Sequence, residues 1–377
     1  MKLIHISDLH LGKKVNEISM LDEQEHILNE IAEIAEGEKP CVMVIAGDIY
    51  DKPVPPAEAV RLFDSFLVRI SEAEIPVLAI SGNHDSPERI AFGSKLMKRS
   101  SVYLSPVYNG VTEPVTIEDE YGKVNFYMLP FVKPSSVRRF FPDENIESYD
   151  DAVRAAVKAM NVDTSERNVM IAHQFVTGAE RCDSESVSVG GVDDVGADIF
   201  AEFDYAALGH IHGAQRVGAE TVRYCGTPLK YSFSEVNHKK SVTVAELKEK
   251  GSTEIRTVPL TPINEMREIK GSYMEVTSRS FYTEENRNDY VRVILTDEQD
   301  IPEGIGKLRA VYPNIMALEY DNKRTRAEYR DIELTNEKIK TPTELFSEFY
   351  EQRNNAPMSA EQQEYISELI EKLWDNE

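Results

Sequence analysis

Five of the eight histidines stand directly after apolar runs, where a strand would end. They occur in the segments "SDLH", "GNHD", "AHQ" and "GHIH", and Asp48 in "GDIYD" closes a similar run. Runs of this kind suit strands that are covered on both faces. Because the carboxyl ends of such strands share one edge of an α/β sheet, these polar side chains are expected to converge on one site. The residues concerned are Asp8, His10, Asp48, His84, His173, His210 and His212.

The donor atoms of this set favour divalent metal ions. Residues two apart on an extended segment point the same way, so Asp8 can act with His10, and His210 with His212. Imidazole, carboxylate and amide oxygen, without thiolate, suit Mn²⁺, Fe²⁺ or Zn²⁺. Even without His84, seven such ligands are available once the amide of Asn83 is included, which is more than one ion takes. Two ions about 3.5–4 Å apart clamp the attacking and leaving oxygens of a phosphoryl displacement, so the sequence predicts phosphoester chemistry.

His84 is the predicted general acid. Cleavage of a phosphodiester requires a proton for the departing oxygen, and histidine titrates near neutral pH. His84 is available for this task because the adjacent Asn83 can serve as the metal ligand. Asp85, or the more distant Asp51, could orient the imidazole, and Asp85 could instead cap the following helix. The sequence leaves these alternatives open, and it places the remaining strand histidine, His5, in or beside the core.

The elements that must position these residues alternate between strands and helices. Helices are expected at about 17–36, 57–72 and 148–161, the last with Ser148 as its N-cap. The order of strand, helix and strand indicates an α/β fold, which the pattern alone suggests to be doubly wound. The expected strands are 2–8, 41–48, 76–83, 124–130, 168–174 and 205–212.

The character of the chain changes after about residue 262. Strands at 273–279, 289–297 and 315–321, with a short helix near 303–311, are expected to form a small separate α+β domain. The sequence therefore divides into a main domain and two C-terminal parts. The predicted boundaries are 1–265, 266–335 and 336–377.

The last part contains a polar connector and two short amphipathic helices separated by "NNAP". Each helix has one apolar stripe at three-to-four-residue spacing. The polar faces are strongly acidic, and the apolar stripes need a surface to cover them. The stripes comprise Leu345, Phe346, Phe349 and Tyr350, and then Tyr365, Ile366, Leu369, Ile370 and Leu373.

Charge and composition limit the partners. The net charge of −24 argues against unaided binding to nucleic acid, because neutralising phosphates takes clustered lysine and arginine. Any role on DNA would need metal ions, a local basic patch or a partner. No run approaches the roughly 20 apolar residues that span a bilayer, and the N-terminus lacks the basic head of a signal peptide. We expect a cytoplasmic protein with no membrane partner, whose three cysteines are reduced packing residues.

The motifs "SDLHLGK", "GDIYD", "GNHDSPERIAFGS", "AHQF" and "LGHIH", in this order, resemble those of the calcineurin-like metallophosphoesterases. Together with "YCGTPLKYSFSE", the longer forms most closely resemble the SbcD family, the nuclease subunits of bacterial SbcCD complexes. The resemblance runs the full length of the chain and is weakest between 262 and 335. It implies a four-layer α/β fold, a two-sheet β-sandwich flanked by helices, in place of the doubly wound sheet.

The resemblance also implies a role for each site residue. His84 would contact the scissile phosphate and protonate the leaving group, with Asp85 as a catalytic neighbour. Two divalent ions, Mn²⁺ being the working ion, would share Asp48 as a bridge. Some relatives have a phosphate-orienting histidine where this chain has Asp51 and Lys52, so that role stays open. The implied ligand sets are Asp8, His10, Asp48 and His212 for one ion, and Asp48, Asn83, His173 and His210 for the other.

For function, the resemblance implies a Mn²⁺-dependent DNA exonuclease and endonuclease that processes DNA ends and hairpins in repair at the nucleoid. Residues 266–335 would cap the DNA, and the tail helices would dock on an SbcC-like coiled-coil ATPase, with the chain as a homodimer in a heterotetramer. Two alternatives stay open: a stand-alone enzyme acting on a small-molecule or protein phosphoester, and tail helices folded back on their own domain. A scaffold with a lapsed site would lack ligands, and none is missing.

Overall fold

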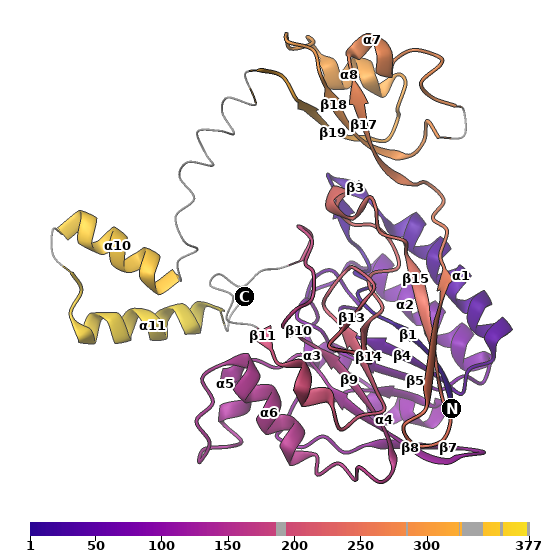
Figure 1. Ribbon diagram of the computed structural model, residues 1–377, viewed down its shortest axis with the longest axis vertical. Helices are drawn as coiled ribbons and strands as arrows, with labels where there is room; N and C mark the ends of the chain where they lie inside the picture. Colours follow the sequence, from indigo (N-terminus) through magenta and orange to yellow (C-terminus); the bar gives the residue numbers. More distant parts are fainter. Residues whose placement is uncertain (186–193, 284–285, 324, 326–341, 355–356, 375–377) are drawn as a thin grey trace. The chain divides into compact units, whose positions relative to one another are not determined.

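The computed structural model describes residues 1–185, 194–283, 286–323, 325, 342–354 and 357–374 (Figure 1). By its contacts the chain divides into two compact units. The first comprises Met1–Glu185 and Asp194–Thr325, and the second contains the C-terminal helices. Among the described residues, no helix is both long and apolar enough to cross a membrane.

Two six-stranded mixed sheets form the centre of the first unit. The first sheet has the order β16-β15-β1-β4-β5-β6, in which β1, β4, β5 and β6 run parallel and β15 pairs antiparallel with both β1 and β16. Its strands are β1 (Lys2–Ile6), β4 (Val42–Ala46), β5 (Val77–Ile80), β6 (Val102–Leu104), β15 (Ser241–Leu247) and β16 (Thr253–Pro259).

The second sheet has the order β13-β14-β12-β9-β8-β7. The apolar runs 124–130, 168–174 and 205–212 lie in this sheet, so the doubly wound single sheet suggested by the pattern is wrong and the two-sheet sandwich is confirmed. Two short strand pairs lie outside the sandwich: β2 (Lys14–Val15) with β3 (Ile18–Ser19), and β10 (Phe175–Val176) with β11 (Asp194–Val195). The second sheet is built from β7 (Val115–Asp119), β8 (Gly122–Leu129), β9 (Arg167–His173), β12 (Tyr205–Gly209), β13 (Gln215–Val217) and β14 (Ala219–Tyr224).

The central strands β1, β4, β5, β9 and β12 are buried on both faces because each sheet packs against the other sheet and against helices. In β1, Leu3 belongs to the core between the sheets, whereas Ile4 and Ile6 belong to the core under the helices. His5 is fully buried, as predicted, and its Nδ1 lies 3.0 Å from the Tyr205 hydroxyl of the other sheet. Alternation along a strand therefore separates two apolar cores, which explains the absence of a polar face.

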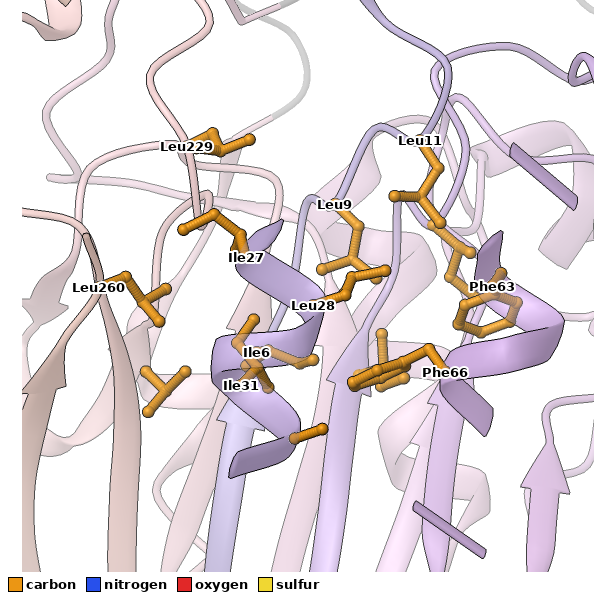
Figure 2. Close-up of a cluster of buried hydrophobic side chains, with 14 of the residues drawn as sticks. Ile6, Leu9, Leu11, Ile27, Leu28, Ile31, Phe63, Phe66, Leu229 and Leu260 are labelled. Carbon is orange, nitrogen blue, oxygen red and sulfur yellow. The ribbon is translucent and has the colours of Figure 1, made fainter. Parts of the chain in front are cut away.

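Helices α1 (Leu21–Glu38) and α2 (Ala57–Glu72) cover the outer face of the first sheet. Figure 2 shows Ile27 and Ile31 of α1 and Phe63 of α2 pointing into this core. On the second sheet the cover comes from α5 (Pro134–Arg138) and α6 (Tyr149–Ala159). Ser148 caps α6 as predicted, since its Oγ accepts a hydrogen bond from the Asp151 amide at 3.1 Å.

A small parallel sheet follows the sandwich: β17 (Met266–Gly271), β18 (Tyr290–Leu295) and β19 (Ile315–Tyr320), with α7 (Tyr273–Val276) and α8 (Gly304–Arg309). The helix near 303–311 and the last two strands are confirmed. The predicted strand 273–279 is wrong, because Ser272 and Glu275 form a capping box that starts α7 there. The first strand of the small sheet is instead β17, which ends directly before Ser272.

A buried carboxylate on α1 ties the small sheet to the sandwich. Glu23, which is 1% exposed, accepts hydrogen bonds from the backbone amides of Ile263 and Asn264 at 2.8 and 2.9 Å. The Tyr290 hydroxyl of β18 lies 3.3 Å from the same side chain. These bonds pair a buried carboxylate of the sandwich with backbone amides of the segment that leads to the small sheet, so the carboxylate is not left unpaired.

The second unit contains α10 (Pro342–Asn354) and α11 (Ala360–Trp374), the two helices expected from the apolar stripes. Phe346 and Tyr350 of α10 line a groove of about 340 Å³ with Tyr365 and Ile366 of α11. Of the predicted connector at 336–342, residues 336–341 lie outside the described residues and Pro342 begins α10.

Candidate metal centre

All the predicted site residues stand at or just beyond the carboxyl ends of five strands. Asp8 and His10 follow β1, Asp48 follows β4, and Asn83 follows β5. His173 closes β9, and the GHIH segment follows β12. The convergence expected at one sheet edge thus involves edges of both sheets. The site is built where the two layers of the sandwich meet.

The backbone at this edge adopts a conformation that side-chain-bearing residues rarely take. Asp8, His10, Asp48 and His210 have φ values of 53°, 45°, 49° and 102°. Left-handed backbone costs free energy for any residue with a Cβ, and it persists where the surrounding structure demands it. Four such residues among the predicted ligands indicate that the loops are shaped to aim side chains inward.

Two glycines of the motifs allow close approaches at this point, Gly209 between the two sheets and Gly82 between neighbouring loops of the first sheet. A Cβ on Gly209 would collide with the backbone oxygen of Ala46, and a Cβ on Gly82 would collide with the Asp48 carboxylate. The close approach therefore needs glycine at both positions. This is a steric reason for the glycine that precedes the polar residues in "GNHD" and "GHIH".

The donors fall into two groups that meet at Asp48. On one side, Nε2 of His10 lies 3.2 Å from Nε2 of His212 and 3.8 Å from Oδ2 of Asp48. On the other side, Nε2 of His173 lies 3.3 Å from the same Oδ2. The Asn83 Oδ1 lies 3.0 Å from both Nε2 of His173 and Nδ1 of His210. One carboxylate therefore lies between two clusters of nitrogen and oxygen donors.

Asp8 completes the first group from the strand side. Its carboxylate is fully buried and accepts the backbone amide of His210 at 3.0 Å and the hydroxyl of Ser7. Nε2 of His173 lies 4.0 Å from Asp8 Oδ1. Donor atoms of Asp8, His10 and His212 all lie within 4.8 Å of one another, and so do those of Asp8, Asp48 and His173.

The carboxylates at the site attract positive charge. When no ion is bound, burial is outweighed by neighbouring acidic groups, which raise the pKa of His173 to about 9 and that of His212 to about 10, so protons on these rings supply the positive charge.

The pKa values of most of the other ligands are shifted mainly by burial. Burial lowers the pKa of His210 to about 3 and holds the pKa of His10 well below its usual value, so both rings are neutral with a lone pair to offer. Burial also raises the pKa of Asp8, whereas the neighbouring histidines hold the pKa of Asp48 well below its usual range. Divalent ions would stabilise both carboxylates in their charged form and occupy the imidazole lone pairs.

His84 lies beside the donors and is partly exposed. Its backbone amide donates to Asp48 Oδ1 at 2.8 Å, and its Nδ1 lies 3.0 Å from the backbone oxygen of Asp51. The ring packs edge-on against His10, with centroids 4.9 Å apart. Of the orienting partners left open by the sequence, Asp51 is the one that contacts this imidazole, through its backbone carbonyl.

Asp85 has a different set of contacts from those the sequence suggested. Its carboxylate accepts the backbone amides of Ile49, Tyr50 and Gly82 at 3.1, 2.9 and 2.9 Å. The cap of the following helix α3 (Pro87–Ile90) is Ser86. Asp85 thus fastens the loop after β4 to the loop after β5, and it acts on the site through the placement of those loops.

The two residues considered for phosphate orientation, Asp51 and Lys52, have different surroundings. The Asp51 carboxylate pairs with Lys13 at 2.7 Å, whereas Lys52 is exposed. Lys13 itself lies over the ring of Tyr231, 5.6 Å from its centroid.

Of the cysteines, Cys225 packs in the interior as expected, but Cys41 is exposed.

Sequence reasoning missed the polar residues that hold the ligands from behind. The His173 Nδ1 lies 2.8 Å from the Ala46 carbonyl, and the His212 Nδ1 lies 2.8 Å from Ser184 Oγ and 3.3 Å from Glu235 Oε1. Glu235 closes the segment "YCGTPLKYSFSE". No local pattern marks it as a partner of a ligand, because the ligand it contacts, His212, lies 23 positions earlier in the chain.

The donor set fits divalent metal ions. It offers imidazoles, buried carboxylates and one amide oxygen, and the Nδ1 of His10 is a buried nitrogen without a hydrogen-bond partner in the described part of the chain. Histidine and carboxylate donors suit first-row divalent ions. A two-sheet sandwich with such a centre at the strand ends defines a class of metal-dependent phosphoesterases.

Comparison with known proteins agrees with this class. The family model for calcineurin-like phosphoesterase matches residues 1–214, and the model described as type 5 capsule protein repressor C-terminal domain, SbcD_C, matches residues 262–354. The chain belongs to the calcineurin-like phosphoesterases and, within them, to the SbcD family. It is a metal-dependent phosphodiesterase.

Two relatives, each named as the D component of the nuclease SbcCD, match along their whole length. The protein from Staphylococcus epidermidis is 32% identical over 384 residues, which is 100% of this chain and 100% of the relative. The protein from Staphylococcus saprophyticus is 31% identical over 379 residues, covering 99% and 98%. Among solved structures, a dimetal phosphatase from Danio rerio covers 68% of this chain and 95% of its own at 10% identity, with a TM-score of 0.41.

Proposed function

We propose that this chain is a Mn²⁺-dependent DNA nuclease, acting as exonuclease and endonuclease on DNA ends and hairpins together with an SbcC-like ATPase in repair. The observation that carries the proposal is the meeting of two donor groups at Asp48 with His84 beside them. The names of the relatives support the substrate and the partner. We place the protein in the cytoplasm, at the nucleoid.

We assign each of the two donor groups to one metal ion, with Asp48 as a ligand of both. Bound there, two divalent ions would supply Lewis acidity to the phosphate oxygens and an activated water. In His173 and His212 one ring nitrogen faces the centre while the other is bonded behind it. The ligand sets are Asp8, His10, Asp48 and His212, and Asp48, Asn83, His173 and His210.

In this proposal His84 donates the proton to the leaving oxygen. The Asp51 carbonyl, 3.0 Å from Nδ1, accepts a hydrogen bond from that nitrogen and keeps it protonated. The Nε2 atom is then the one that gains and loses the catalytic proton. The backbone amide of His84 donates to Asp48, so the position of the proposed acid is fixed relative to the metal-binding carboxylate.

The division of labour along the chain is also a proposal. Residues 1–265 carry the chemistry, 266–335 form a DNA-capping domain fixed to α1 through Glu23, and 336–377 reach the ATPase. The two C-terminal regions favour DNA as the substrate, because an enzyme acting on a small phosphoester would need neither a capping domain nor an ATPase-docking tail. A partner that grips DNA would also offset the net charge of −24.

The direct test of the substrate is digestion of linear DNA by the purified chain with Mn²⁺. We expect shortening of linear duplex and opening of hairpin ends, and a chromogenic phosphodiester should be cleaved as well. Cleavage of the small ester alone, with DNA untouched both with and without an SbcC-like ATPase, would favour the stand-alone phosphoesterase.

The tail helices are the proposed docking element for the ATPase. Phe349 and Tyr365 are 53% and 62% exposed, and such apolar side chains on neighbouring helices suit a partner surface. We expect the double substitution Phe349→Asp and Tyr365→Asp to abolish co-purification with an SbcC-like ATPase while DNA cleavage by the isolated chain persists. The exposed Gln363→Asp serves as the control for added charge, and retention of the ATPase by the double variant would refute docking through this face.

The proposed homodimer has a candidate surface beside the site. Phe92 and Leu96, next to α3 and in α4 (Ser94–Met97), are 84% and 71% exposed, and Val60 of α2 is 43% exposed. A second copy of the chain would cover them. Sedimentation equilibrium should give a dimer for the native chain and a monomer for Phe92→Ser with Leu96→Ser; a monomeric native chain at micromolar concentration would contradict the proposal.

A further inference from the structure

The two donor groups differ in what holds their histidines from behind. In one group the Nδ1 of His173 faces a backbone carbonyl, that of Ala46, at 2.8 Å. In the other group the Nδ1 of His212 faces side chains, Ser184 Oγ at 2.8 Å and Glu235 Oε1 at 3.3 Å, with Cys182 next to them. A backbone partner is fixed by the strand itself, whereas a side-chain partner depends on its own surroundings.

Glu235 is part of a buried ion pair. Its side chain is fully buried, and its Oε2 lies 2.6 Å from the ammonium group of Lys240, whose side chain is 7% exposed. Oε1 also accepts the Ser184 hydroxyl at 2.6 Å, so the two Nδ1 partners are bonded to each other. The Lys240 ammonium donates to the backbone oxygen of His212 at 3.0 Å and to Thr227 Oγ1 at 2.6 Å. The pair therefore holds His212 by its ring and by its backbone.

Stability alone is a weak reason to bury such a pair. Desolvating two charges costs about as much as their attraction returns, and apolar residues of similar volume are often at least as stable. A carboxylate that accepts the far nitrogen of a metal-binding histidine, by contrast, fixes the ring tautomer and increases its strength as a ligand. The Nε2 of His212 is thereby left to face Nε2 of His10, 3.2 Å away.

We propose that Glu235 and Lys240 are a positioning pair that sets the affinity of one of the two ion sites, the one completed by His212, separately from the other. This inference rests on the proposed two-ion centre. The site of His173 and His210 is held by the sheet and stays tight, whereas the His212 site is adjusted by side chains. The two ions are then bound with unequal affinity, and the His212 ion is the exchangeable one.

The test is calorimetric titration of the full-length, metal-stripped chain with Mn²⁺. The double variant Glu235→Leu with Lys240→Met replaces the pair by apolar residues and leaves no charge unpaired. We expect the first ion to bind with unchanged affinity and the second to bind about 10–100-fold more weakly. Glu235→Gln with Lys240→Met, which restores an acceptor for Nδ1, should recover part of that affinity.

Two further variants complete the experiment. Lys250→Met is the control, because it removes the lysine of another ion pair, whose Nζ lies 2.8 Å from the Asp204 carboxylate. Asp204 directly precedes the first residue of β12, at the end of the strand away from the site, so both affinities should stay unchanged. Ser184→Ala, which keeps all charges, tests the same ring if the double variant fails to fold, and should weaken only the second ion. Equal weakening of both ions, or no change in either, overturns the inference. A native chain that binds fewer than two ions would instead overturn the proposed centre.

Discussion

Replacing His84 by alanine is expected to lower the rate of DNA cleavage by about 10²–10⁴-fold while the chain keeps its metal ions. The reason is geometric: the bond from His84 to Asp48 is made by its backbone amide, which alanine keeps, and the Nδ1 of the ring lies at the Asp51 carbonyl. Removing the ring therefore removes the proton donor and leaves the Asp48 contact in place. Metal content should be measured on the same preparation as single-turnover cleavage.

The leaving group provides a sharper version of this experiment. An ester whose leaving group is already a weak base needs little help from an acid, so His84→Ala should slow a nitrophenyl phosphodiester far less than DNA. His26→Ala, an exposed imidazole on α1, is the matched control and should change neither rate. The donor atoms of His84, His10 and Asp48 also lie within 4.8 Å of one another, so loss of an ion from His84→Ala would show that this ring is a ligand and not the acid.

Replacing Asp48 by alanine is expected to empty both ion sites and to reduce cleavage by at least about 10³-fold, since the ions supply several kcal/mol of the barrier reduction. Asp48 is 2% exposed, and its Oδ2 is the oxygen within 3.3 Å of His173 and 3.8 Å of His10, one from each donor group. Neither group has its full charge without this carboxylate.

The measurement is ion stoichiometry by elemental analysis after dialysis against Mn²⁺, together with the cleavage rate. Asp48→Asn keeps the shape and the hydrogen bond to the His84 amide but loses the charge, and it should behave like the alanine variant. Asp64→Asn on the exposed face of α2 is the control for loss of an acidic residue. One ion retained at native affinity in Asp48→Ala would contradict the bridging role.

The predicted strand 273–279 shows where local pattern fails. Tyr273, Met274 and Val276 are typical of a strand, but Ser272 and Glu275 satisfy the first amides of a helix and decide the local structure. The strands at 290–295 and 315–320 were predictable because β-branched and apolar residues there meet no competing cap.

By itself the sequence determined which residues could bind metal, because polar donors just after buried apolar runs must lie at strand ends. It also determined the class, through motifs whose glycines and donors are adjacent in the chain. Only the tertiary structure decided that the runs form two sheets, that Asp85 fastens two loops, and that Glu235 and Lys240 hold His212 from behind. Local periodicity reports burial and strand length, whereas the arrangement of the sheets and of the site depends on contacts between residues remote in sequence, such as His10 and His212, which are 202 positions apart.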